Sequence, residues 1–163
     1  MWVSVRPCYP TTDDLSEVRI PDSLKQGAPP GTQFAASPKG WINQDIFCRW
    51  LDFFIQNVPS ARPILLIYDG HASHLSIEVI EKARAHDIHL LCLPPHCTHI
   101  LQPLDVSVMS SLKCHFGKAC KDFMSKNPGR VITEADLAGL VGKAWPLALT
   151  PSNLIAGFTK TGI

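Results

Sequence analysis

The pattern of apolar and polar residues changes near residue 40. Before it, the chain is rich in Pro, Gly, Ser and Thr, and only VSV (3–5) and VRI (18–20) have the character of short strands. This predicts a loop-rich segment with one edge strand. After it, apolar residues recur at helical spacing as far as Pro59: Phe47, Trp50, Leu51, Phe54, Ile55 and Val58. The spacing predicts an amphipathic helix with Asn43 as its N-cap.

Residues 64–93 have the pattern of a strand-helix-strand unit. ILLIY (64–68) is a continuous apolar run of strand length, LSIEVIEKARAHD (75–87) is helix-forming, and IHLLCL (88–93) is a second apolar run. Such runs are typical of strands that are buried on both faces of a parallel sheet. Because the strands of a βαβ unit run parallel, Asp69 and the loop after Leu93 should lie at the same edge of the sheet. Open α/β folds place their chemistry at that edge.

The C-terminal part of the chain carries further helical patterns. In the first, apolar residues repeat every three or four positions: Met109, Leu112, Phe116, Ala119, Cys120 and Phe123. Extending this stripe backwards at about 100° per residue places Asp105 on the inward side of the helix's first turn. The second pattern opens at Thr133, where Asp136 can complete a capping box, and Pro146 should end or kink it. A short helix is expected to begin in TPSNLIAGF (150–158).

Composition narrows the class of protein. The 163 residues are 45% hydrophobic and 18% charged, which is ordinary for one globular unit. A net charge of +1 is not the footprint of a free-standing nucleic-acid-binding domain, so any contact with DNA must be local or come from sequence outside this chain. The six cysteines form no CxxC pair and indicate free thiols in a reducing compartment. No apolar run approaches the roughly 18 residues of a membrane-spanning helix, which predicts a soluble intracellular protein without membrane contact.

Two carboxylates stand where chemistry could occur, Asp69 at a strand end and Asp105 at the start of a helix. Mg²⁺ and Mn²⁺ prefer carboxylate oxygens and water, and two such ions about 4 Å apart can clamp the attacking and leaving oxygens of a phosphodiester. A structural interpretation is also open, in which Asp69 belongs to an Asp-Gly turn and Asp105 complements a helix dipole. From the residue types alone, the structural interpretation is slightly favoured.

Histidines and cysteines flank both carboxylates. His71 and His74 in HASH, and His96, Cys97 and His99 in HCTH, are zinc-ligand types, but their spacing matches no common zinc finger. Histidines that hydrogen-bond to backbone or carboxylate groups are the favoured interpretation, and nothing in the sequence activates Cys97 as a nucleophile. Four lysines lie off the apolar stripe of the first C-terminal helix, where a solvated surface is favoured over a row of phosphate contacts: Lys113, Lys118, Lys121 and Lys126.

Several motifs resemble those of a known family. IYDGHASH (67–74), LPPHCTHILQPLDVSVM (93–109) and NLIAGFTKTGI (153–163) resemble the catalytic domain of pogo/Tigger-like DDE transposases, the group that includes the centromere-protein-B and jerky-type domesticated proteins. GWINQDIFCRWL (40–51) matches in order and spacing, so the resemblance runs from about Gly40 to the C-terminus. It implies an α/β, ribonuclease-H-like mixed sheet flanked by helices. It also implies three acidic residues that bind two Mg²⁺ ions for DNA strand cleavage and transfer.

The resemblance assigns roles to particular residues. Asp69 would be the second catalytic, metal-binding acid and Asp105 the third, and His71 would support the site or position a phosphate. The cofactor would be Mg²⁺ or Mn²⁺, the partner DNA and the compartment the nucleus, and a homo-oligomer is compatible with the family. The first acid should lie upstream on an opening strand, but the upstream candidates stand in Pro- and Ser-rich sequence: Asp13, Asp14 and Asp22.

The same resemblance divides the chain into two parts. Residues 1–40 would be a loop-rich remnant of the early core strands, and residues 41–163 the C-terminal part of the DDE catalytic core. The sheet would then be incomplete at its N-terminal strands, which leaves one edge of strand 64–68 unpaired unless residues 1–40 cover it. Without the first acid, phosphoryl transfer should fall steeply. The leading function is therefore a metal-dependent DDE endonuclease core, and the alternative is a catalytically inactive domesticated nuclear module that binds DNA or protein. An unrelated zinc-dependent hydrolase that uses the HASH and HCTH histidines is the least favoured.

Overall fold

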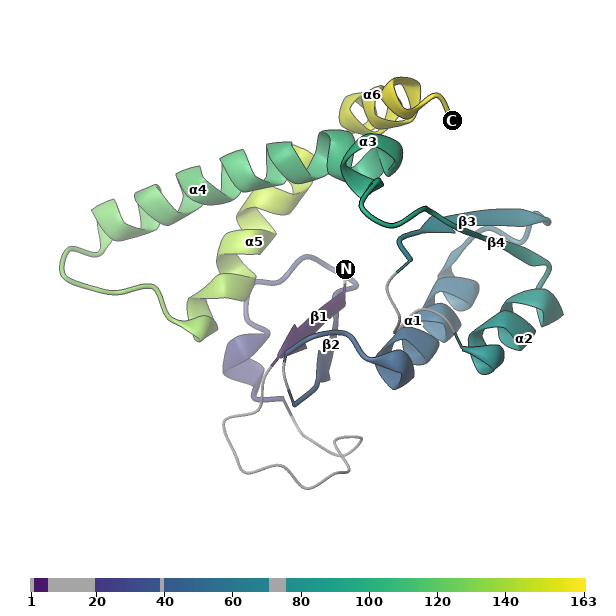
Figure 1. Ribbon diagram of the computed structural model, residues 1–163. Coiled ribbons are helices and arrows are strands. Elements are labelled where there is room, and N and C mark those ends of the chain that lie inside the picture. Colours follow the sequence, from purple (N-terminus) through teal and green to yellow (C-terminus); the bar gives the residue numbers. More distant parts are fainter. Residues whose placement is uncertain (1, 6–19, 39, 71–75) are drawn as a thin grey trace.

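The computed structural model describes residues 2–5, 20–38, 40–70 and 76–163, which form a mixed α/β structure (Figure 1). The strands are β1 (Trp2–Val5), β2 (Gln33–Ala36), β3 (Ile64–Tyr68) and β4 (Ile88–Cys92). The α-helices are α1 (Gln44–Asn57), α2 (Ile77–Ala85), α3 (Thr98–Leu101), α4 (Met109–Lys126), α5 (Glu134–Ala148) and α6 (Pro151–Thr161). A 3₁₀ turn, η1 (Asp22–Leu24), precedes β2, and a π-helical turn, η3 (Leu104–Val108), leads into α4.

Helix α1 confirms the amphipathic helix expected after residue 40. The side chain of Asn43 accepts a hydrogen bond of 2.9 Å from the backbone N–H of Ile46, so Asn43 is the N-cap. This bond satisfies one of the backbone donors that a helix start leaves without an intrahelical partner. The helix ends at Asn57, two residues before Pro59, and its buried side lies towards β3 and α2.

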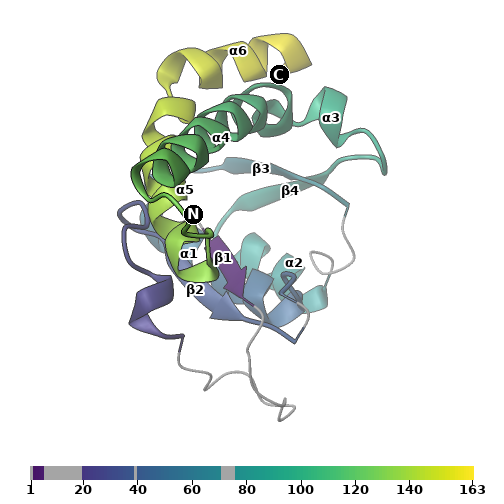
Figure 2. The same ribbon diagram turned by 90° about the vertical axis from the view of Figure 1, so that its left-hand side faces the viewer.

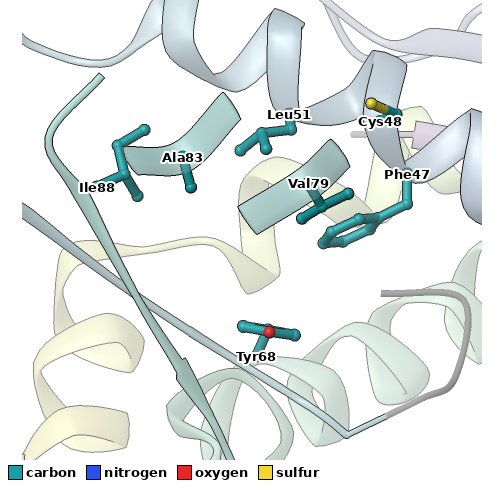
Figure 3. Packing of buried hydrophobic residues seen from close by; sticks show 7 residues of the cluster. All are labelled: Phe47, Cys48, Leu51, Tyr68, Val79, Ala83 and Ile88. Carbon is teal, nitrogen blue, oxygen red and sulfur yellow. The ribbon is translucent and has the colours of Figure 1, made fainter. Parts of the chain in front are cut away.

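The predicted βαβ unit is present. Strands β3 and β4 pair in parallel, with Ile64 opposite Ile88 and Tyr68 opposite Cys92, and α2 is the crossover between them. Figure 3 shows that side chains from both helices and both strands meet in one core cluster, made up of Phe47, Cys48, Leu51, Tyr68, Val79, Ala83 and Ile88. The apolar patterns of residues 43–58 and 64–93 thus form a single core.

The expectation that both strands are buried on both faces is wrong. Leu65 of β3 is 57% exposed and Leu91 of β4 is 46% exposed. Figure 2 shows the reason, since α1 and α2 both lie on the same side of β3 and β4. Helices α4 to α6 lie to one side of these strands (Figure 1). Only one face of the sheet is therefore packed, although the sequence is apolar on both.

The N-terminal segment contains more structure than the sequence predicts. The edge strand expected at VSV is confirmed as β1, whereas VRI lies largely outside the described residues. Strand β2 was not predicted because its buried residues, Ala35 and Ala36, give no alternating pattern. Strands β1 and β2 pair in parallel in a sheet of their own, so among the described residues β3 has a strand partner on one side only.

The C-terminal helices form a hairpin and a final short helix. Thr133 and Asp136 make the expected capping contact, because the N–H and Oγ1 of Thr133 donate hydrogen bonds of 2.9 and 2.8 Å to Oδ2 of Asp136. Helix α5 continues past Pro146 to Ala148, so this proline does not end the helix. Thr150 caps the predicted last helix, α6, by accepting a bond from the N–H of Asn153.

Candidate functional site

Asp69 lies at the carboxyl edge of the β3–β4 sheet, directly after the last residue of β3. The strand ends are held together here, because the N–H of Leu93 donates a 2.9 Å hydrogen bond to the carbonyl of Tyr68. The next residue, Gly70, is close to β4: a Cβ at this position would lie 3.2 Å from both the Sγ of Cys92 and the carbonyl oxygen of Leu93. Oδ1 of Asp69 is buried. The turn is therefore tightly packed and holds the carboxylate partly out of solvent.

Asp105 lies in the π-helical turn η3 and its side chain is exposed, so the expectation that it faces inward is wrong. The buried residue of this turn is Val108, at 1% exposure. The physical reason is that hydrogen bonds in a π-helix join residues i and i+5, so each turn holds more residues than an α-helix turn. Counting back from α4 at the α-helical angle therefore misplaces Asp105. Single π-helical turns occur often at functional sites.

The chain segment that connects the two aspartates passes through the edge of the sheet where Asp69 lies. The strands are parallel, so the chain leaves β4 at the edge where Asp69 lies, and then runs through α3 to η3 (Figure 1). Helix α6 packs directly on the start of η3. A Cβ on Gly157 of α6 would lie only 2.5 Å from the carbonyl oxygen of Pro103, so this close approach requires glycine.

The C-terminal motif NLIAGF therefore has a structural role. Asn153 joins two other helices, because its Nδ2 donates to the carbonyl of Ala148 at 2.8 Å and to Oγ of Ser111 at 3.3 Å. Together with the close packing at Gly157, these bonds hold α6 against the segment that carries Asp105. The motif thus positions one of the two candidate ligands without itself supplying one.

The other candidates from the sequence are residues outside the described part of the chain and one aspartate in an exposed turn. His71 and His74 lie outside the described residues, as do Asp13 and Asp14. Asp22 is the first residue of η1 and forms an exposed ion pair of 2.9 Å with Lys25. Within the part of the chain that the structure describes, no group of three or more His, Cys, Asp or Glu side chains could hold a metal ion. Asp69 and Asp105 remain the two candidate ligands.

Sequence reasoning missed a polar network between α1 and α2. Lys82 donates to Oδ2 of Asp52 at 3.0 Å and to Sγ of Cys48 at 3.2 Å, and the thiol of Cys48 donates to Glu78 at 3.1 Å. Burial, and then the hydrogen bond to Glu78, raise the pKa of the Cys48 thiol. The hydrogen bond to Asp52 raises the pKa of Lys82. A thiol kept protonated is a poor nucleophile, so this network supports the fold and is not a reactive centre.

Comparison with known proteins identifies the family. Residues 17–158 match the family described as DDE superfamily endonuclease, so the chain belongs to this family of transposase-like nucleases. The chain is also 30% identical over 132 residues to a protein named MFS-type transporter clz9 from Cochliobolus lunatus. That alignment covers 79% of this chain but 14% of the fungal protein, so the chain spans about a seventh of its length. No solved structure matches.

The fold agrees with membership of this family. A mixed α/β structure with a short parallel sheet is consistent with a ribonuclease-H-like fold that is incomplete at its N-terminal strands. Among the described helices, none combines the length and the apolar character that crossing a membrane requires. The closer likeness to pogo/Tigger, centromere-protein-B and jerky-type proteins rests on the motifs alone.

Proposed function

We propose that this chain is part of the catalytic core of a pogo/Tigger-like DDE transposase, which cleaves and transfers DNA strands in the nucleus with Mg²⁺ or Mn²⁺. Membership of the DDE superfamily endonuclease family supports a nuclease. The observation that carries the proposal to a particular site is the position of Asp69, which follows a parallel strand at the carboxyl edge of the sheet with one carboxylate oxygen buried. Open α/β proteins bind their ligands at that edge.

Asp69 and Asp105 would hold the divalent ion. Mg²⁺ is usually held by one or two carboxylates, with waters and substrate phosphates in the remaining positions, so two aspartates are a sufficient protein donor set for one ion. The bound ion would stabilise the negative charge that develops on the phosphate during displacement. His71 is proposed to orient that phosphate. The tight turn at Gly70 would keep Asp69 in place, and α6 would keep the Asp105 segment in place through its contact with Pro103.

Nicking of supercoiled plasmid DNA in Mn²⁺ tests this proposal. We expect the wild type to nick DNA slowly, because the first acid is missing. Asp69→Asn and Asp105→Asn should each abolish that nicking, because each replaces a charged carboxylate ligand by a neutral amide of similar shape. Asp87→Asn is the matched control, since Asp87 directly precedes β4 and so lies at the opposite edge of the same sheet. Asp87 has a φ of 53°, a conformation that asparagine also accepts, so the control should fold normally. Nicking that persists at full rate in Asp69→Asn would contradict the proposal.

A readout other than activity separates binding from catalysis. Metal that binds only the folded chain stabilises it by about 2.7 kcal/mol at a hundredfold excess over Kd. We expect Mn²⁺ to raise the thermal midpoint of the wild type and of Asp87→Asn, and to raise that of Asp69→Asn and Asp105→Asn much less. An equal rise in all four proteins would show that the ion binds elsewhere.

A catalytically inactive domesticated module, which binds DNA or protein in the nucleus, is the second candidate. It is favoured by one observation, that the side chain of Asp105 is exposed and does not face inward as a buried metal ligand would. A folded wild-type chain that neither nicks DNA nor gains stability from Mn²⁺, yet binds DNA, would support this alternative. Gel filtration of the same samples would test the prediction of a homo-oligomer.

A further inference from the structure

A groove lies between α4 and α5, which form a helical hairpin extending to one side of the β3–β4 sheet (Figure 1). Its volume is about 560 Å³. Three lysines line it: Lys118 and Lys126 come from α4, and Lys143 comes from α5. The sequence places the first two on a helix surface, but only the packing of the hairpin brings Lys143 to the same groove.

The groove carries local positive charge in a chain whose net charge is only +1. None of its three lysines forms a salt bridge with any described residue. Asp122 is the one carboxylate among the described residues that line the groove. Arg130 is nearby in sequence but is already engaged, because its guanidinium group donates to Asp136 at 2.7 Å and lies 5.0 Å above the ring of Phe123. The lysines are thus the available cations.

We propose that this groove binds the phosphate backbone of duplex DNA. The inference rests on the proposed function and extends it to a surface of the hairpin, away from the candidate metal ligands. Lysine ammonium groups contact phosphates as point charges and read no sequence. Lys118 and Lys126 are eight residues apart on one helix, about 12 Å at a rise of 1.5 Å per residue. Along the duplex axis one DNA strand advances about 3.4 Å per nucleotide, so a helix lying parallel to that axis would present these two lysines three to four nucleotides apart.

The apolar residues of the groove do not favour base stacking. Phe123 and the imidazole of His115 are the two aromatic rings among the described residues that line it, and the guanidinium group of Arg130 covers a face of the larger ring, that of Phe123. Proteins that hold single strands use aromatic faces as stacking platforms. A groove with exposed lysines and a covered phenylalanine is better suited to the outside of a duplex, where the backbone is the accessible part.

The test is equilibrium binding of the whole chain to a fluorescently labelled DNA duplex of arbitrary sequence, measured across a range of salt concentrations. The groove variant replaces Lys118, Lys126 and Lys143 by Gln. The matched control replaces Lys113, Lys121 and Lys160 by Gln, which removes the same number of charges from exposed positions that do not line this groove. Because each lost phosphate contact lowers the salt slope by about 0.9, the groove variant should lose about 2 to 3 units of slope and at least about tenfold in affinity.

A variant that binds DNA more tightly separates the role of the groove charge from a folding defect, because a misfolded protein would bind less DNA, not more. Asp122→Asn removes the carboxylate of the groove and should tighten DNA binding, whereas Glu81→Gln makes the same charge change at an exposed position on α2 and should not. Equal weakening of DNA binding by both triple variants would show that the groove is not the binding site. The chain would still be a DNA-binding protein, so the proposed function would stand. A wild-type chain that binds no duplex would also overturn the groove, and the plasmid-nicking assay would then decide the proposed function separately.

Discussion

Replacement of Gly157 by alanine should destabilise the protein, although glycine-to-alanine changes inside helices normally stabilise. Gly157 lies within α6 and is buried against the start of η3. A Cβ at this position would lie 2.5 Å from the carbonyl oxygen of Pro103 and 3.1 Å from its carbonyl carbon. These are backbone atoms, so no side chain can rotate away, and α6 would have to move outwards by nearly an ångström.

Two opposing effects set the size of the change in unfolding free energy in Gly157→Ala. Alanine is favoured over glycine inside a helix by about 1 kcal/mol. Forcing extra volume into a well-packed site costs about 1–3 kcal/mol, and the upper part of that range applies where backbone atoms collide. The expected net loss is therefore about 1–2 kcal/mol of unfolding free energy. For a chain of this size, that loss corresponds to a fall of roughly 2–8 °C in the thermal midpoint.

Urea denaturation of Gly157→Ala beside Gly117→Ala gives the measurement its control. Gly117 lies within α4, and a Cβ there would meet nothing within 4 Å, so only the helix preference operates. We expect Gly117→Ala to stabilise by about 0.5–1 kcal/mol and Gly157→Ala to destabilise. A Gly157→Ala protein as stable as the wild type would show that α6 does not pack on Pro103 as described, and would remove the support proposed for the Asp105 segment.

Three further predictions concern stability and reactivity. Asp136→Asn should lower stability at neutral pH, because the two hydrogen bonds from Thr133 hold the pKa of Asp136 below its ordinary value. The difference in stability from the wild type should shrink as the pH falls through that lowered pKa, and unfolding curves measured from pH 7 to 2 test this. Cys48 should react with a thiol reagent at pH 8 far more slowly than the exposed Cys114, and unfolding in urea should remove this difference in rate. Equal rates in the folded chain would contradict the burial of Cys48. Leu65→Thr should change the free energy of unfolding by less than about 0.5 kcal/mol, because Leu65 is 57% exposed. Leu51→Ala, at a position with 0% exposure, should lower it by about 2–5 kcal/mol. Similar losses of stability in the two variants would mean that the outer face of the sheet is covered.

Local sequence patterns were sufficient to predict a helix or strand wherever the spacing of apolar residues and a capping residue indicated the same element. The helical spacing after Asn43, the apolar runs on either side of α2 and the Thr133–Asp136 pair all predicted elements that the structure contains. These features depend on neighbours within a few residues, so the sequence carries them in full. The family motifs likewise predicted an α/β nuclease fold, which the family match confirms.

Three features could not be predicted because they depend on parts of the chain far apart in sequence. An apolar run does not reveal whether one or both faces of its strand will be covered, and here α1 and α2 cover the same face. The spacing along α4 gave no sign of the π-helical turn that turns Asp105 outwards. The lysines of α4 have the sequence pattern of an ordinary solvated surface, and only the packing of α5 brings Lys143 to the same groove.

The sequence was enough to predict α1, the parallel β3–α2–β4 unit, the helices α4 to α6 and the family, because each follows from local periodicity, capping or a motif. Three features depend on tertiary packing: the sheet is packed on one face, Gly157 lets α6 approach η3 closely, and a lysine-lined groove lies between α4 and α5. The physical reason is that burial, close contact and local charge density arise from surfaces that meet only after the chain has folded.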